Sequence, residues 1–220
     1  INVITSMTLI LPNTSSVVVS SLRQLLGRAK VQDDVPTLTA YAVDASIYRM
    51  TPQAVVLAEQ EEDIEKVVRF AVARGIPLTP RAAGTNLTGS AIGSGIILDV
   101  SKMNRILDVN EEERWARVQP GIVLAELNKQ LGRRNLLFGP DPSSGDMCKL
   151  GGMLANNSSG PHTLRYGSVK DNVHRLRLCL ESGTWLEAKS YALNDPTLER
   201  LLSTIPALRD VLILAQTYAD

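Results

Sequence analysis

Two stretches rich in glycine and small polar residues carry the strongest chemical signal in this sequence. Residues 80–89 read PRAAGTNLTG, and residues 150–160 read LGGMLANNSSG. Glycine lets a backbone approach a ligand closely, and successive N–H groups in such turns form concave surfaces that bind anions. Two stretches of this kind predict a long ligand with a pyrophosphate near its middle, which is the shape of a dinucleotide cofactor.

The first stretch combines an arginine and two glycines with short polar side chains: Arg81, Gly84, Gly89, Thr85, Asn86 and Thr88. The arginine could pair with a phosphate, although an arginine at a strand end is often a surface cation. Taken alone, the stretch also fits an ordinary tight turn. Neither the GxGxxG pattern of dinucleotide-binding units nor the GxxxxGK[ST] pattern of nucleotide triphosphatases is present. We therefore expect the anion to be held by a loop with few formal charges rather than by a lysine and magnesium.

The second region begins earlier, at FGPDPSSGD, where Pro140 and Pro142 restrict the backbone around Asp141. Clusters of Asn, Ser and Gly are usually plain loops, yet a loop this long would be costly to order without a ligand. We interpret Asp141 as a residue that orients the loop, rather than as a general base. His162 is interpreted as a polar loop residue, and His174 as facing solvent or a neighbouring lobe.

The elements around these stretches predict an α+β (α/β) fold. An apolar strand at 54–58, an amphipathic helix at 61–75 and strands from 76 and at 95–100 form a parallel β-α-β unit. Two hairpins follow, one with its turn at 110–114 and one with its turn at Ser182-Gly183, and a helix after Gly121 lies between them in the sequence. Trp115 and Trp185 are expected to pack within these hairpins. A helix is predicted over 22–30, capped by Ser20 or Ser21, and two helices follow Asp195.

This pattern suggests three segments. They are an N-terminal extension and helix at 1–40, a first lobe at 41–100, and a mixed or antiparallel second lobe at 101–220. The last segment ends in mid-pattern, so we expect a fragment of a longer protein.

Composition excludes several classes of function. Lys plus Arg and Asp plus Glu both number 23, so no basic surface invites nucleic acid. No apolar run reaches the roughly 18 residues of a membrane span, and the first residues do not resemble a signal peptide. Cys148 and Cys179 are isolated, which indicates neither a zinc site nor a disulfide framework. We expect a cytoplasmic protein, with peripheral attachment to the inner membrane face as an alternative.

Several motifs in sequence order resemble one known family. RAAGTNLTG resembles the pyrophosphate loop of the FAD-linked oxidases, the PCMH-type or vanillyl-alcohol oxidase flavoproteins. FGPDPSS, LGGMLANNSSGPH and RYG (165–167) resemble later motifs of that family in the same order, and QPGIVLAELN (119–128) resembles its strand-to-helix connection. The resemblance covers about residues 40–188 and is nearest the D-lactate and glycolate dehydrogenases, including forms fused to an iron–sulfur module.

The resemblance implies that FAD lies extended between two lobes. On one side it implies contacts from Arg81, Ala83, Gly84, Thr85, Asn86, Thr88 and Gly89. On the other side it implies contacts from Asp141, Ser144, Gly151, Gly152, Asn156, Ser159, Gly160, Tyr166 and Gly167. Ala82 and Ala83 stand where relatives usually carry glycine. Thr85 stands where members with a covalently attached flavin carry histidine, so non-covalent FAD is implied.

The implied activity is oxidation of a D-2-hydroxy acid such as lactate or glycolate by hydride transfer to FAD. Electrons would leave to a quinone, a cytochrome or an iron–sulfur module. In such relatives the substrate is handled by a later cap domain, so no catalytic residue is expected in this sequence. Alternatives are an aldonolactone oxidase, a cell-wall enolpyruvyl reductase, or a non-catalytic FAD-binding subunit.

Overall fold

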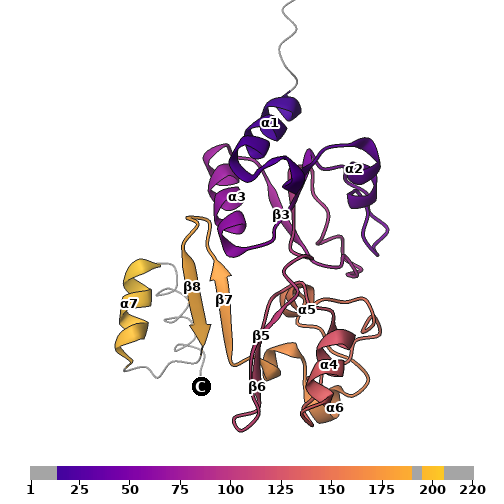
Figure 1. Ribbon diagram of the computed structural model, residues 1–220, viewed down its shortest axis with the longest axis vertical. Coiled ribbons are helices and arrows are strands. Elements are labelled where there is room, and N and C mark those ends of the chain that lie inside the picture. The colour runs from indigo at the N-terminus through magenta and orange to yellow at the C-terminus, as the bar shows by residue number, and fades with distance from the viewer. Residues whose placement is uncertain (1–13, 190–194, 206–220) are drawn as a thin grey trace, which may run out of the picture. The chain divides into compact units, whose positions relative to one another are not determined.

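The computed structural model describes residues 14–189 and 195–205 (Figure 1). The chain forms two compact units, one of Ile1–Val173 with Cys179–Leu186, the other of His174–Leu178 with Glu187–Asp220. The predicted lobe boundaries at residues 40 and 100 do not coincide with this division and stay predictions.

A four-stranded sheet organises the first part of the larger unit. Its strands are β1 (Val31–Gln32), β2 (Ala54–Leu57), β3 (Leu78–Arg81) and β4 (Ile96–Asp99), in the order β1-β2-β4-β3. β4 lies between β2 and β3 and is parallel to both, whereas β1 is antiparallel to β2. All four residues of β4 are buried, as expected for a central strand covered on both faces. The predicted parallel β-α-β unit is confirmed.

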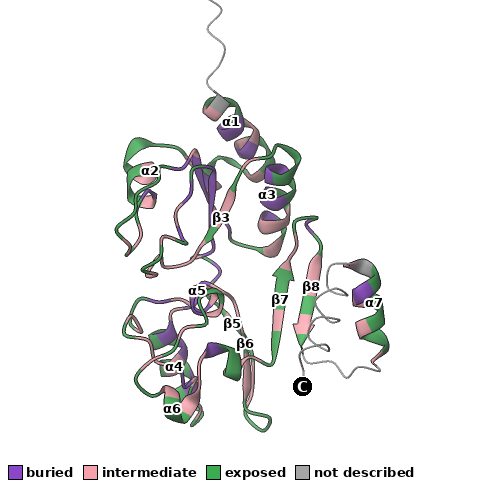
Figure 2. Cartoon of the chain, turned by 180° about the vertical axis from the view of Figure 1, so that it is seen from behind, coloured by how far each residue is buried: buried purple, intermediate pink, exposed green. Residues whose placement is uncertain are grey.

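Three helices accompany this sheet: α1 (Thr14–Leu26), α2 (Val35–Tyr41) and α3 (Glu61–Ala73), with a 3₁₀ turn at Arg28–Lys30. Figure 1 shows α1 and α3 on one side of the sheet and α2 on the other. Figure 2 shows the buried residues gathered on the strands and on the inner faces of α1 and α3. Their core consists of residues such as Val19, Leu22, Val67, Phe70 and Leu98.

The prediction of a helix over 22–30 was wrong in its bounds. Helix α1 ends at Leu26, and Ser20 lies inside it, where its hydroxyl donates to the Val17 carbonyl at 2.9 Å. Because Val18 and Val19 are buried beside Leu22, packing outweighs the low helix propensity of β-branched residues. Neither β1 nor α2 was predicted. For α2 a signal was present, since Asp34 caps the helix by accepting from the Thr37 N–H and proline follows in the first turn.

The rest of the larger unit combines a hairpin with short helices. Strands β5 (Ile106–Asn110) and β6 (Trp115–Val118) pair antiparallel, as predicted. Helices α4 (Leu124–Gly132), α5 (Leu150–Ala155) and α6 (Thr163–Tyr166) follow, with a 3₁₀ turn at Val169–Asn172. Their core includes Ile122, Leu124, Leu127, Leu131, Leu150, Met153 and Val169. The predicted helix after Gly121 therefore forms, and its leucines face inward as expected.

The last elements are the hairpin β7 (Arg175–Cys179) and β8 (Trp185–Lys189), and helix α7 (Pro196–Thr204). Asp195 caps α7 by accepting from the Thr197 N–H at 2.8 Å, as predicted. Trp185 is half-buried and donates its indole N–H to Glu65 of α3. The second predicted tail helix lies outside the described residues, as does the sequence before residue 14.

Candidate cofactor site

A hollow of about 410 Å³ opens at the carboxyl ends of β3 and β4. Its walls come from α2, from these two strand ends and from the segment before α5. The lining residues are Ala40, Tyr41, Arg81, Ala82, Ala83, Thr85, Asp99, Ser101, Met147 and Lys149. Ligands of parallel α/β sheets bind outside the carboxyl ends of strands, because the loops there converge on one edge. Three predicted site residues, Arg81, Ala83 and Thr85, line this hollow.

Arg81 is held in place by the backbone around it. Its Nη1 donates to the carbonyls of Tyr41, Val43 and Ala91 at 3.3, 2.8 and 3.3 Å. Its guanidinium carbon lies 5.0 Å from the centre of the Tyr41 ring. A Cβ added to Gly84 would lie 2.7 Å from Nη2, so only glycine lets the loop close over this side chain. Arg81 is thus a fixed charge in the wall, around which the loop folds.

The backbone of the first stretch leaves donors free. No N–H group of Ala83, Gly84 or Thr85 donates to an acceptor within the described residues. Gly84 has a φ of 69°, and its carbonyl accepts from the Ala45 N–H at 3.0 Å. Backbone N–H groups need partners when a ligand or the fold excludes water. Consecutive N–H groups without an acceptor, beside a fixed positive charge, can bind an anion by hydrogen bonds and by charge attraction.

Asn86 and Asp44 hold the far end of this loop. The Asn86 carbonyl oxygen accepts from the N–H groups of Thr88 and Ser90 and from the Thr88 hydroxyl. The Asp44 carboxylate accepts from Asn86 Nδ2 and from the N–H groups of Ser46 and Ala91. Burial would raise the pKa of Asp44, but these hydrogen bonds lower it overall. The side chains of Asn86 and Thr88 therefore serve the loop itself, and Gly89 packs against Tyr48.

Asp99 and Tyr41 form a second fixed pair in the hollow. Asp99 is 4% exposed, and its carboxylate accepts from the Tyr41 hydroxyl at 2.6 Å and from the Ser101 N–H at 2.6 Å. Burial and the Asp99 carboxylate both raise the pKa of Tyr41, so the phenol stays protonated. Sequence reasoning missed both residues. The signal was Asp99 itself, a charge at the end of an otherwise apolar buried strand.

The second predicted stretch is partly a helix rather than a loop. Leu150–Ala155 forms α5, and neither of its glycines has a positive φ; Gly151 is the one that allows close packing. A Cβ on Gly151 would lie 2.8 Å from the Pro120 ring, and one on Gly152 would lie 3.8 Å from Ala82. Asn156 Nδ2 donates back to the Gly152 carbonyl at 3.1 Å. At Gly152 the second stretch thus lies close to Ala82 of the first.

Asp141, Gly160 and His162 form a third cluster. The Asp141 carboxylate accepts from the His162 backbone N–H at 3.2 Å and also meets His162 Nδ1. The hydrogen bond from His162 lowers the pKa of Asp141. A Cβ on Gly160 would lie 2.1 Å from the Asp141 carbonyl oxygen. A Cβ on Gly139 would lie 2.6 Å from the Tyr166 ring, so this ring also packs closely against a glycine. The two motifs FGPDPSS and GPH therefore pack together, and the Asp141 carboxylate links them by its contacts with His162.

The remaining predicted residues play local parts in the described structure. The Ser144 carbonyl accepts from the N–H groups of Met147 and Cys148, Ser159 is exposed, and Gly167 has a φ of 73° that closes α6. None of these three lines the hollow. Met147 and Lys149 do line it and were not predicted, although they stand directly before Leu150-Gly151-Gly152.

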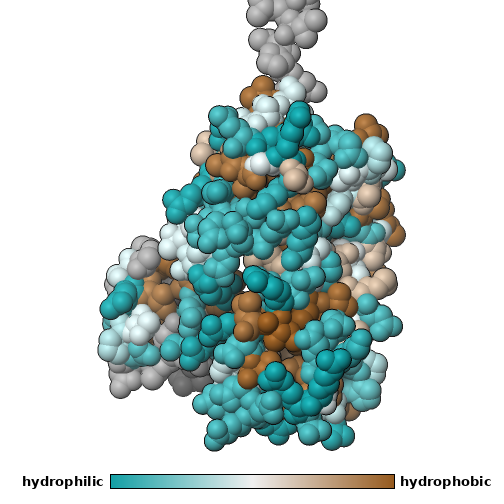
Figure 3. All heavy atoms as spheres, in the orientation of Figure 1, coloured by the Kyte–Doolittle hydropathy of each residue, from teal (hydrophilic) through white to brown (hydrophobic). Residues whose placement is uncertain are grey.

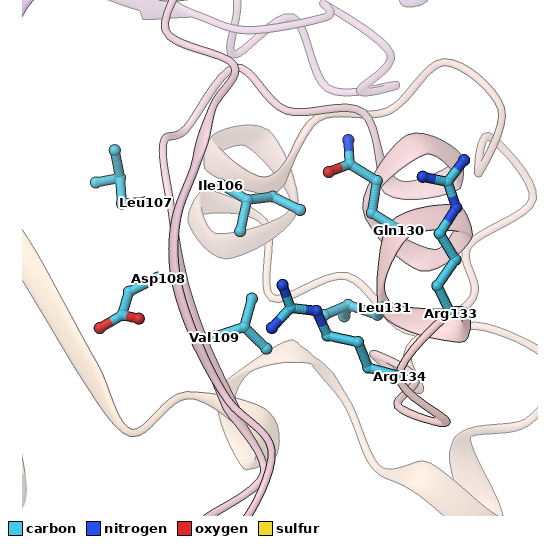
Figure 4. A pocket seen from close by; sticks show the side chains of 8 residues that line it. All are labelled: Ile106, Leu107, Asp108, Val109, Gln130, Leu131, Arg133 and Arg134. Atoms are coloured by element: carbon cyan, nitrogen blue, oxygen red, sulfur yellow. The ribbon is translucent and has the colours of Figure 1, made fainter.

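Another hollow, of about 420 Å³, lies between β5 and α4 (Figure 4). Figure 4 shows the side chains of Ile106 and Val109 of β5 pointing toward Leu131 of α4. Ile106 and Val109 are three positions apart and yet lie on the same side of the strand. An irregular register between Ile106 and Asp108 explains this spacing, because a bulge shifts the two-residue alternation. Figure 3 shows an apolar area over β5, α4 and α5. No predicted site residue lines this hollow, and its floor continues the core.

Within residues 14–189 and 195–205, no three His, Cys, Asp or Glu side chains gather as metal ligands would. The same ranges contain no helix with the length and apolar character needed to cross a bilayer.

The free N–H groups, the fixed cation and the hollow at the strand ends define a nucleotide-cofactor-binding protein, in a fold of linked parallel and antiparallel parts. Residues 52–189 match the FAD binding domain family, and the chain belongs to that family. FAD fits this site, since a diphosphate needs just such donors, and the hollow would take one part of so long a molecule.

Relatives with curated names share most of this chain. It is 36% identical over 187 residues to a D-2-hydroxyglutarate dehydrogenase of Pseudomonas putida, covering 82% of the chain and 18% of the relative. It is 32% identical over 187 residues to the glycolate oxidase subunit GlcD of Escherichia coli, covering 84% of the chain and 38% of that subunit. The chain thus spans well under half the length of either relative.

Solved structures agree on the fold. An alkyldihydroxyacetonephosphate synthase superposes with a TM-score of 0.74 at 25% identity, covering 88% of this chain and 38% of that one. A p-cresol methylhydroxylase superposes with a TM-score of 0.60 at 21% identity, covering 78% of this chain and 35% of that one. The PCMH-type fold predicted from the motifs is therefore confirmed.

Proposed function

We propose that this chain is the FAD-binding part of a dehydrogenase that oxidises a D-2-hydroxy acid. The observation that carries the proposal is its 36% identity to a D-2-hydroxyglutarate dehydrogenase over 82% of its length. The likeness to a glycolate oxidase subunit adds a second hydroxy acid of the same class. The substrate would lose its Cα hydrogen with two electrons, and its hydroxyl proton, to become a 2-oxo acid.

Bound FAD would supply the acceptor for those two electrons. The part of this chain is to bind and orient it, because flavin chemistry asks the protein mainly for position and electrostatics. The free N–H groups of Ala83, Gly84 and Thr85 would face the diphosphate, with the fixed charge of Arg81 behind them. The cluster around Asp141 and Gly160 would shape the other wall. The other residues predicted to contact FAD would lie beside these two walls: Ser144, Gly151, Gly152, Asn156, Ser159, Tyr166 and Gly167.

We also propose that the flavin is held without a covalent bond. Thr85 lines the hollow where covalently flavinylated members of the family carry histidine, and a threonine hydroxyl is a poor nucleophile without a base. Electrons would pass on to a quinone, a cytochrome or an iron–sulfur module. A cytoplasmic location, with or without attachment to the inner membrane face, suits such acceptors.

Anaerobic reduction of the bound flavin tests the proposal. The protein carrying this chain is purified, and its visible flavin absorbance is followed after adding D- or L-2-hydroxyglutarate, D- or L-lactate, or glycolate. Bleaching by a D-hydroxy acid or glycolate, and not by the L-forms, is expected. A bound flavin that none of these acids reduces would contradict the proposed activity. Acid precipitation should release the FAD, and flavin that stays with the pellet would contradict non-covalent binding.

A further inference from the structure

Lys149 stands out among the residues of the hollow because its ammonium group has no partner in the part of the chain that the structure describes. It is half-buried and lines the hollow. Within the described residues its ammonium group makes neither an ion pair nor a hydrogen bond. A half-buried ammonium loses part of its hydration and gains from a counter-ion that replaces it.

Asp99, the acidic residue that lines the hollow, already accepts hydrogen bonds from other groups of the protein. Both oxygens of Asp99 accept hydrogen bonds, from Tyr41 and from Ser101. Arg81, the other cation of the hollow, donates to three carbonyls and is packed against Gly84. Lys149 therefore differs from Arg81 in having a charge that can move to meet a ligand.

Lys149 lines the same hollow as the loop residues Ala82, Ala83 and Thr85, but comes from the segment before α5. Its backbone forms an isolated bridge with Val123, and its carbonyl accepts from the Met153 N–H at 3.0 Å. The backbone is therefore fixed while the long side chain is free to adjust. Three residues further on, a Cβ built on Gly152 would lie 3.8 Å from the Ala82 Cβ, so this segment runs close to the loop.

We infer that Lys149 is the cation that contacts the diphosphate of FAD, whereas Arg81 shapes the wall that presents the loop N–H groups. Lys149 thereby makes the site selective for FAD over flavins that lack a diphosphate. This inference rests on the proposed flavin site but not on the proposed substrate. A lysine suits the task because it acts on phosphate as a point charge and does not need the planar geometry of a guanidinium.

Affinities of the apoprotein for FAD and for riboflavin test this inference. Charge-assisted hydrogen bonds to phosphate are strong, so Lys149→Gln should weaken FAD binding about tenfold or more. Riboflavin has no diphosphate, so its affinity should stay within about twofold, as should the FAD affinity of Lys149→Arg. The melting temperature of the apoprotein should not change, because the side chain has no partner to lose. Lys66→Gln, on the exposed face of α3, is the matched control for loss of one positive charge.

Three results would overturn the inference: unchanged FAD affinity in Lys149→Gln, an equal loss of riboflavin affinity, or a lower melting temperature of the apoprotein. A wild-type protein that takes up no FAD would overturn it as well. None of these measurements uses a hydroxy acid. Failure to reduce the flavin with such acids would therefore count against the proposed activity alone.

Discussion

Asn86 Nδ2 donates to the Asp44 carboxylate at 2.9 Å, joining two segments that lie 42 residues apart. The same carboxylate accepts from the N–H groups of Ser46 and Ala91. One carboxylate thus joins the loop before β2 to two positions, Asn86 and Ala91, of the glycine-containing loop after β3. Together with Arg81, which donates to the Val43 and Ala91 carbonyls, Asp44 therefore holds the loop beside the hollow in place.

Asp44→Asn should lower the free energy of unfolding by about 1–2 kcal/mol, because an amide has one acceptor oxygen where the carboxylate has two. Urea denaturation of the apoprotein measures this, and FAD affinity should fall with it. Asp108→Asn, at an exposed position on β5, is the control and should change stability by less than about 0.5 kcal/mol. Equal effects of both substitutions would contradict the role given to Asp44.

The same bond predicts how stability changes with pH. The pKa of Asp44 is lowered in the folded protein, so its contribution is present above the unfolded pKa of about 3.9. It is lost as the pH falls through the lower, folded pKa. The stability difference between wild type and Asp44→Asn should therefore be constant above about pH 5 and shrink below pH 4. A difference that grows in acid would be inconsistent with this assignment.

Arg81→Lys should destabilise the apoprotein by about 1–2 kcal/mol. The lysine side chain is shorter, so its ammonium would not reach the position from which Nη1 meets three carbonyls, and it would lose the planar guanidinium beside the Tyr41 ring. Thermal melting measures this without any flavin. Arg74→Lys is the control, because Arg74 also lies over a ring, 3.9 Å from the centre of Phe70, but is exposed. If Arg81→Lys leaves melting unchanged and weakens only FAD binding, Arg81 is a direct phosphate ligand instead of a wall residue.

The sequence predicted the position of the site better than the role of its side chains. Glycine spacing located the loop around Gly84, because steric freedom of a backbone is a property of the residue itself. That Arg81 would turn inward could not be predicted, since its three acceptors belong to Tyr41, Val43 and Ala91, which only the fold brings near.

The second stretch illustrates the same limit. Gly151 and Gly152 suggested a loop, but both lie in helix α5. At Gly151 the absence of a Cβ allows close packing against Pro120, whereas at Gly152 a Cβ would fit beside Ala82 at 3.8 Å. Glycine is a poor helix former, so local propensity predicts a loop here, whereas tertiary packing stabilises a helix. Lys149 was missed because a lysine beside two glycines has no signature. The reason for proposing it is that its ammonium has no partner among the residues that the structure describes, which only the folded structure can show.

Asp63→Asn should be the most destabilising substitution in the first sheet region. Asp63 is 2% exposed and accepts from Lys30 Nζ at 2.7 Å and from the N–H groups of Glu59 and Gln60. Removing one partner of a buried ion pair costs about 3–5 kcal/mol. We expect the lower end, because Glu59 also lies 3.9 Å from Lys30. Urea denaturation measures the loss.

The control for this pair is Glu126→Gln on the surface of α4. Glu126 and Lys129 are 4.0 Å apart, with 51% and 69% of their side chains exposed. Exposed pairs of this kind contribute less than about 0.5 kcal/mol. Comparable losses at the two sites would show that burial does not set the strength of the Lys30–Asp63 pair.

Gly160→Ala should damage the second wall of the site, because its Cβ would lie 2.1 Å from the Asp141 carbonyl oxygen and 2.4 Å from the carboxylate. Backbone at both positions would have to separate, at a cost of about 1–3 kcal/mol, and the contact between Asp141 and His162 would open. Gly132→Ala is the matched control, since nothing lies within 4 Å of its Cβ and alanine favours the end of α4. We therefore expect lower melting temperature and weaker FAD binding for Gly160→Ala, and unchanged or slightly higher melting temperature for Gly132→Ala. Normal FAD affinity in a destabilised Gly160→Ala protein would mean that the Asp141 cluster supports the fold but does not shape the cofactor site.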